Sequence, residues 1–74
     1  MLPCWAVITP VKIMFDFFIK EHREDKDVHY IWVHNYNSVL GRNYAGYTLA
    51  GRWADMEDFT QIVSYIETHK SRRD

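Results

Sequence analysis

Histidine, cysteine and carboxylate side chains are the residues of this chain that could hold a metal ion. His29 and His34 have four residues between them, a separation within the range of ligand spacings in zinc sites. In a regular strand, however, residues five positions apart point to opposite faces. Cys4 is the single cysteine, so no cysteine pair completes a ligand set. The sequence therefore predicts no metal site.

Catalytic patterns are missing as well. A thiolate at Cys4 would need a neighbouring base and a third, orienting group, and no local motif supplies them. Ser38 stands outside a nucleophile-elbow pattern, and no glycine-rich loop precedes a predicted helix. Glu57 and Asp58 are adjacent, so they point in different directions on a helix. We expect no catalytic residues, no cofactor and no enzyme activity.

Size and charge limit the domain count and the partners. Seventy-four residues predict one domain over 1–74 with a thin core, because a chain of this length buries roughly 60% of its unfolded surface. Nine Lys and Arg against ten Asp and Glu give a net charge of −1, which offers no overall attraction to nucleic acid or to a membrane. With one cysteine, no leader pattern and no apolar run of about 20 residues, the sequence predicts a cytoplasmic protein.

The elements that would position functional side chains begin with a short strand and a helix. Residues 4–8 have strand composition, and Thr9-Pro10 is typical of a helix start. Ile13 and Phe17 lie on a flank of the predicted helix, which makes its apolar stripe wider than a small monomer needs. We expect this flank to mediate self-association. The inner face repeats at helical spacing and comprises Val11, Met14, Phe15, Phe18 and Ile19.

The middle of the chain predicts a pair of antiparallel strands. Residues 28–36 have the composition of a strand, with Ile31 and Val33 on its inner face. Turn-forming residues follow and favour a hairpin to a second strand at 44–50. Gly46 inside that strand predicts a bulge or a close approach of another group to the backbone.

A final helix completes the predicted order. It is expected to begin near Asp55 and to leave a frayed tail at 70–74. The order is then β-α-β-β-α, or α-β-β-α if the first strand does not form. The predicted fold class is α+β: a small two-layer sandwich in which a short antiparallel hairpin packs on two helices. The inner face of the last helix comprises Met56, Phe59, Ile62, Val63 and Ile66.

The second face of the hairpin is aromatic and would stay open in such a sandwich. Three Trp, five Tyr and four Phe make up 16% of the chain, more than so small a core can easily hide. We therefore hypothesise a non-catalytic protein-binding module. It would be a homodimeric regulator or inhibitor of a larger protein, of the kind that phages and bacteria encode. The expected partner contacts on the open face are Tyr30, Trp32, His34 and Tyr36.

The alternative hypothesis is nucleic-acid binding. The predicted order is similar to the first five elements of an RNA-recognition module, in which aromatic residues on the sheet stack on bases. Residues 42–49 lie at the place of that family's third-strand motif, although Asn43 replaces a glycine and Gly46 an aromatic residue. The near balance of charges favours the protein-binding hypothesis. Under the alternative, the phosphate contacts are Arg42, Arg52, Lys70, Arg72 and Arg73.

Overall fold

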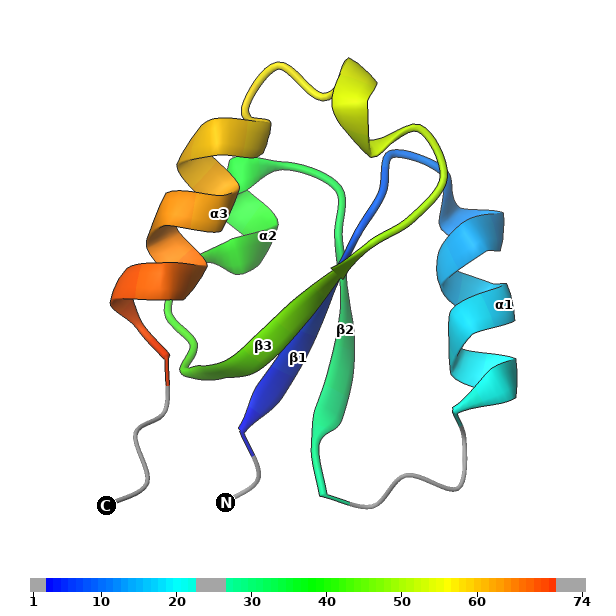
Figure 1. Ribbon diagram of the computed structural model, residues 1–74, viewed down its shortest axis with the longest axis horizontal. Helices are drawn as coiled ribbons and strands as arrows, with labels where there is room; N and C mark the ends of the chain where they lie inside the picture. The colour runs from blue at the N-terminus through cyan, green and yellow to red at the C-terminus, as the bar shows by residue number, and fades with distance from the viewer. Residues whose placement is uncertain (1–2, 23–26, 71–74) are drawn as a thin grey trace.

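The chain forms a small sheet that has helices on both of its faces (Figure 1). The structure, a computed structural model, describes residues 3–22 and 27–70. The α+β character and the first strand are confirmed. The elements of the described residues are β1 (Cys4–Ile8), α1 (Lys12–Glu21), β2 (His29–Val33), α2 (Tyr36–Val39), β3 (Tyr44–Leu49), the 3-10 turn η1 (Trp53–Asp55) and α3 (Phe59–Thr68).

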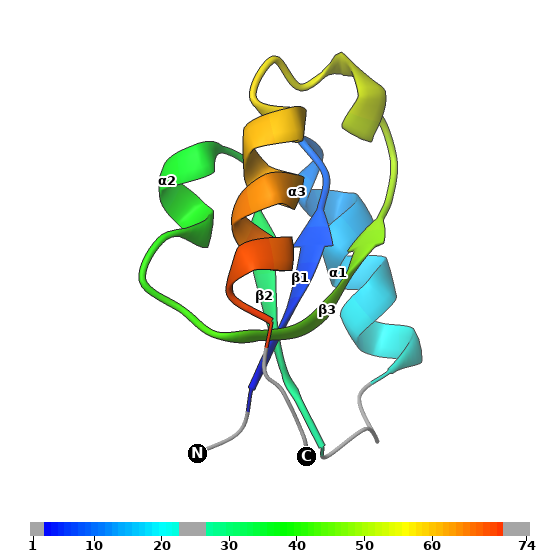
Figure 2. The same cartoon turned by 60° about the vertical axis from the view of Figure 1, so that its left-hand side comes forward.

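The three strands run parallel, in the order β2-β1-β3. The central strand is therefore β1, whose residue Cys4 is in register with His29 on one side and Tyr44 on the other. The predicted antiparallel hairpin is wrong. The connection from β2 to β3 contains α2 and crosses β1, so the two strands lie at opposite edges of the sheet (Figure 2). Parallel strands need such a crossover, whereas a hairpin needs only a tight turn.

Helix α2 stands where the sequence predicts a turn. Asn35 caps it: Oδ1 of Asn35 accepts hydrogen bonds from the backbone N–H of Ser38 at 2.9 Å and from its hydroxyl at 2.8 Å. An Asn in this position satisfies one of the free N–H groups at a helix start. Val39 of the same helix is fully buried. The pattern Asn35-x-x-Ser38 is thus the local signal that favours a helix over a hairpin.

The helices divide between the faces of the sheet. Helices α2 and α3 lie side by side on one face, and α1 lies on the other (Figures 1 and 2). The predicted two-layer arrangement with both helices on one side is replaced by helix, sheet and helix layers. The inward positions of Ile31 and Val33 are confirmed, as is the inner face of the last helix. The main core lies on the α2–α3 side and comprises Ala6, Ile8, Ile31, Val33, Val39, Tyr44, Met56, Ile62 and Ile66.

Helix α3 begins later than predicted, at Phe59 instead of near Asp55, because η1 forms a separate turn before it. Asp58 is the N-cap residue of α3, but its side chain makes no capping hydrogen bond to that helix. Its Oδ2 atom accepts a hydrogen bond from the backbone N–H of Tyr36 at 2.6 Å. This bond joins the N-terminal ends of α2 and α3.

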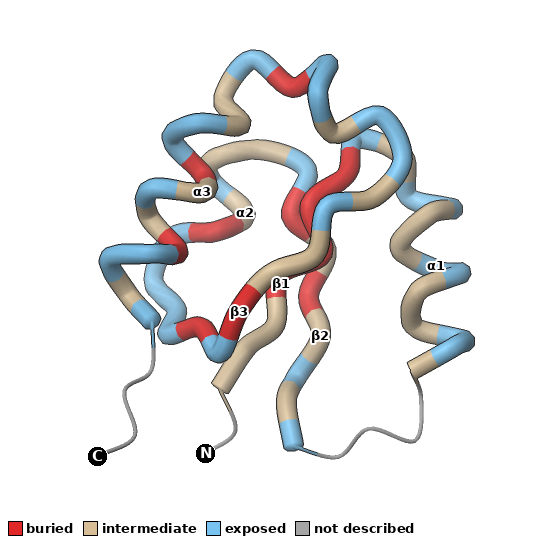
Figure 3. Tube along the Cα trace, in the orientation of Figure 1, coloured by how far each residue is buried: buried red, intermediate tan, exposed pale blue. Residues whose placement is uncertain are grey.

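Helix α1 packs more loosely than the other long helix. It contacts β1 and β2, yet none of its residues is buried (Figure 3). Its predicted inner face is half-buried, and the flank formed by Ile13 and Phe17 is exposed. No helix within the described residues is long and apolar enough to cross a membrane.

The last described residues, after α3, pair with the start of β3. Lys70 forms a parallel bridge with Tyr44, whose backbone N–H donates to the carbonyl of His69 at 3.0 Å. The rest of the predicted tail, residues 71–74, lies outside the described residues.

Candidate functional site

The four residues expected to contact a partner do not share one surface. Tyr30 and Trp32 are half-buried on the side of the sheet that α1 covers. His34 is exposed beyond the end of β2, with its ring centroid 4.3 Å from that of Trp32. Tyr36 begins α2 and packs on the opposite side, edge-on to Tyr65. The predicted open face is wrong, because β2 ends before His34 and α1 lies over the strand.

The described cationic residues of the nucleic-acid hypothesis lie at both ends of β3: Arg42 and Lys70 near its start, and Arg52 after its end. Arg52 and Lys70 form surface ion pairs with neighbouring carboxylates, at 2.8 and 3.5 Å. Arg42 is exposed, while Arg72 and Arg73 lie outside the described residues. The parallel sheet also lacks the hairpin on which the resemblance to an RNA-recognition module depends.

The candidate residues for metal or nucleophile chemistry include Cys4, which is in register with His29. Within the part of the chain that the structure describes, no three His, Cys, Asp or Glu side chains gather closely enough to hold a metal ion. Cys4 is half-buried and packs against the main core. His29 and His34 are both exposed.

The carboxyl end of the sheet is filled by the chain itself. Parallel sheets commonly bind ligands there, between strands whose connections leave toward opposite faces, as those of β1 and β3 do. Gly51 has a φ of +57°, and a Cβ on it would lie 2.8 Å from both Oγ1 of Thr9 and Cγ of Met14. Thr9 is buried, and its carbonyl accepts the indole N–H of Trp32 at 2.9 Å. A ligand site must be sought elsewhere.

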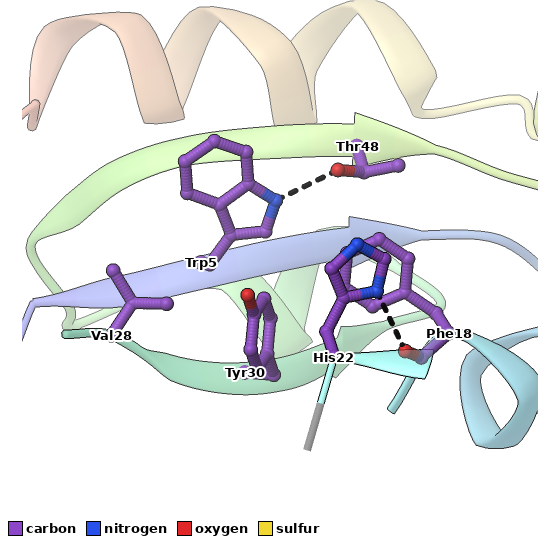
Figure 4. Close-up of a pocket in the computed structure, with 6 residues that line it drawn as sticks. All are labelled: Trp5, Phe18, His22, Val28, Tyr30 and Thr48. Carbon is purple, nitrogen blue, oxygen red and sulfur yellow. Dashed lines mark hydrogen bonds between the residues drawn. The ribbon is translucent and has the colours of Figure 1, made fainter. Parts of the chain in front are cut away.

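A cavity of about 220 Å³ lies on the α1 side of the sheet, beneath the last turn of that helix (Figure 4). Each strand contributes one residue to it and α1 contributes Phe18, while His22 follows α1 and Val28 precedes β2. Since α1 packs on β1 and β2, the cavity lies where the helix leaves part of the sheet uncovered. The lining residues are Trp5, Phe18, His22, Val28, Tyr30 and Thr48.

One wall of the cavity is a cluster of aromatic rings. Phe18 and His22 stack with their centroids 4.1 Å apart, and Tyr30 meets Phe18 edge-on at 5.1 Å. Nδ1 of His22 lies 2.9 Å from the backbone carbonyl of Phe18. A carbonyl only accepts, so Nδ1 carries the proton and donates, which leaves Nε2 of the neutral ring as an acceptor. Ring stacking and this bond together fix the orientation of the imidazole.

Trp5 provides another wall. Its indole N–H donates to Oγ1 of Thr48 at 2.8 Å, as Figure 4 shows. The six-membered ring lies over Gly46 of β3, and a Cβ on that glycine would be only 2.8 Å from Cζ3 of Trp5. The predicted close approach at Gly46 is confirmed. The register also shifts beside this pair, as a bulge does.

Sequence reasoning does not identify the cavity, because its residues come from separate elements. The one local signal is an aromatic residue followed four positions later by His at a helix end. Phe18 and His22 form this pair in α1, and Tyr65 and His69 repeat it in α3. There too, Nδ1 of His69 lies 2.9 Å from the Tyr65 carbonyl, and the rings stack at 3.9 Å. The pattern predicts a capped helix end and says nothing of a cavity.

The outer face of α1 is the second candidate surface. Ile13 is 56% exposed and Phe17 is 55% exposed, one helical turn apart. Beside them, Nζ of Lys12 lies 3.2 Å from Oδ1 of Asp16. Aliphatic and aromatic side chains exposed as neighbours on one helix are typical of a protein contact.

Neither a protein-family model nor a curated protein sequence nor a solved structure matches the chain.

Proposed function

We propose that this chain is a small, non-catalytic protein-binding module that self-associates through the outer face of α1 and regulates or inhibits a larger protein. The observation that carries the proposal is the joint exposure of Ile13 and Phe17. No residue of α1 is buried in the single chain. Contact with a partner would remove the apolar side chains of its outer face from water, which favours association.

A second copy of the chain fits this face when the two α1 helices pack antiparallel about a two-fold axis. Ile13 then meets Phe17 of the second copy, and each flank meets the same flank running in the opposite direction. Lys12 lies beside Asp16 of the second copy, and the reverse pair forms as well. Together with the Lys12–Asp16 pair within each chain, at 3.2 Å, these contacts make a ring of four alternating charges.

Parallel packing of the same helices is disfavoured. In a parallel pair each core residue meets its own copy, and a residue on one flank faces the residue five positions further along on the opposite flank of the partner helix. Asp16 would then face Glu21 of the second copy. Two carboxylates in that position repel each other, so the charges select the antiparallel arrangement.

Sedimentation equilibrium of the full chain over a range of concentrations tests the self-association. We expect a reversible dimer whose dissociation constant rises at least tenfold in Phe17→Ser, because the lost contact lies at the centre of the interface. Leu40 is a matched control, since it is 41% exposed but lies in the loop after α2. Leu40→Ser should dimerise as the unaltered chain does.

A charge exchange tests the antiparallel geometry. Lys12→Glu should weaken the dimer, because Glu would face Asp16 of the second copy. The double variant Lys12→Glu, Asp16→Lys should restore it, since both the internal and the intermolecular pairs are re-formed with reversed sign. A chain that stays monomeric at every concentration, or a Phe17→Ser variant that dimerises normally, would show that the outer face of α1 is not the interface.

A tagged pull-down from native lysate, with and without nuclease, tests the regulatory part. One stoichiometric protein that resists nuclease is the expected result. Material that is lost on nuclease treatment would support nucleic-acid binding instead.

A further inference from the structure

We propose that the cavity beneath the last turn of α1 is a binding site for one planar nitrogen heterocycle that carries both a hydrogen-bond acceptor and an N–H donor. The proposal is independent of self-association, because none of the cavity residues lies on the outer face of α1.

The size of the cavity selects a small planar ligand. About 220 Å³ accommodates a one- or two-ring system. Its walls are aromatic on two sides: the indole of Trp5 on one, and the cluster of Phe18, His22 and Tyr30 on the other (Figure 4). A flat ring placed between such walls gains stacking contacts, which a branched aliphatic ligand of equal volume does not.

The polar groups select the hydrogen-bonding pattern. Oγ1 of Thr48 accepts the indole N–H of Trp5, so the Thr48 hydroxyl proton can be donated to an acceptor on a ligand. His22 donates through Nδ1, so Nε2 of its neutral ring can accept from an N–H of a ligand. An acceptor and a donor on the same planar ring system are characteristic of purines and pyrimidines.

The wall residues are held in place before any ligand arrives. The indole of Trp5 is fixed by Thr48 and by its contact with Gly46. His22 is fixed by the Phe18 carbonyl and ring. A site organised in this way loses little side-chain freedom on binding, which distinguishes it from a gap left by loose packing.

The chain contains its own reporters for a binding experiment. In a ¹H–¹⁵N correlation spectrum, the indole N–H groups of Trp5, Trp32 and Trp53 give separate signals. Adenine, which has both a donor and acceptors on one ring system, is the probe. We expect the Trp5 signal to shift in a saturable manner, with a dissociation constant of about 1 mM or tighter. Trp53 packs on Phe59, away from the cavity, and its signal should not move.

Three variants of the lining residues and one control variant separate the parts of the site. Val28→Phe fills the cavity from the edge of β2 and should abolish the saturable shift. Thr48→Val removes the hydroxyl and should weaken adenine binding about three- to tenfold, whereas Thr48→Ser should bind normally. Leu40→Phe adds the same bulk at an exposed site and should leave binding unchanged. Thermal unfolding of each variant verifies that the domain is folded.

Competing outcomes are distinct. Equal shifts at Trp5 and Trp53 would overturn the proposal that adenine binds in this cavity. Normal binding by a folded Val28→Phe variant would overturn it as well. Toluene that binds as tightly as adenine would overturn the polar part of the assignment. Adenosine monophosphate then identifies the source of the ring. Binding of adenine alone indicates a free heterocycle, and equal binding of a larger probe indicates a ring presented by a larger molecule.

Discussion

The six-membered ring of Trp5 lies over Gly46, in the neighbouring strand and in register with it. The two residues depend on each other: the ring covers a part of β3, and the missing side chain of the glycine makes room for the ring. An aromatic residue that covers a glycine in an adjacent strand stabilises the pair.

Gly46→Ala should therefore destabilise the domain. The new Cβ would lie 2.8 Å from Cζ3 of Trp5, and the indole cannot move away without losing its bond to Thr48. We expect a loss of about 1–3 kcal/mol in the free energy of unfolding, measured by urea denaturation. The double variant Trp5→Phe, Gly46→Ala is the matched control. If the smaller ring does not reduce the cost of adding the methyl group, the contact is not its cause.

Tyr44→Phe should reveal how much a buried hydroxyl contributes to the free energy of unfolding. The Tyr44 hydroxyl donates to the backbone carbonyl of Val39 at 2.6 Å, and the side chain is fully buried. Its removal leaves a buried carbonyl without this donor, which costs about 1–3 kcal/mol. Thermal or urea unfolding at neutral pH measures this cost. Tyr47→Phe, in the same strand but half-buried, should cost less.

Alkaline pH should destabilise the domain through the same residue. Burial, and to a smaller extent negative charge at the nearby Cys4, raises the pKa of Tyr44 from 10.0 to about 12. Between these values the folded chain retains a proton that the unfolded chain has lost. The contribution of Tyr44 to the free energy of unfolding is therefore full below pH 10.0. It decreases by about 2–3 kcal/mol as the pH rises toward 12. Tyr44→Phe should lack this part of the decrease; equal slopes in both proteins would contradict the assignment.

Asn35→Ala should loosen α2. The substitution removes the side-chain acceptor for both groups of Ser38 and costs about 1 kcal/mol, while the bond from the Ser38 N–H to the backbone carbonyl of residue 35, at 3.1 Å, remains. Asn37, which is exposed within the same short helix, is the control, and Asn37→Ala should be neutral or slightly stabilising. Hydrogen exchange of the Ser38 amide gives a local readout, and it should accelerate in the first variant alone.

Asp58→Ala should separate the starts of α2 and α3. The charged acceptor of the Tyr36 amide is lost, and we expect a cost of about 1.5–3 kcal/mol in urea denaturation. The neighbouring Glu57 is exposed, so Glu57→Ala should leave stability within about 0.5 kcal/mol. Equal effects of the two substitutions would indicate that the bond to Tyr36 contributes nothing specific.

Features that depend on neighbours in sequence could be predicted. Residues 4–8 form the expected strand, Ile31 and Val33 point into the core, and the inner face of the last helix is correct. Strand alternation and helical periodicity decide these features locally. The exposure of Ile13 and Phe17 follows from the same periodicity.

Strand pairing and the cavity could not be predicted in this way. The residues of β3 fit a hairpin partner as well as a parallel neighbour, and only the helix capped by Asn35 between the strands distinguishes the two. The prediction that Tyr36 shares a sheet face with Tyr30 is wrong, because the capped helix ends the strand alternation before Tyr36. The cavity combines residues as distant as Trp5 and Thr48, whose proximity depends on the strand order.

The central place of β1 has a consequence for how the protein is made. This strand leaves the ribosome before both of its neighbours, and the register partner of Trp5 on β3 is Gly46. Sheets built from such distant pairs form slowly, since each contact requires a long segment of chain to be closed. Completion of the sheet therefore waits until β3 has been synthesised. A nascent chain that stalls before β3 has emerged would present one bare edge of its most apolar strand to chaperones, or to another copy of itself.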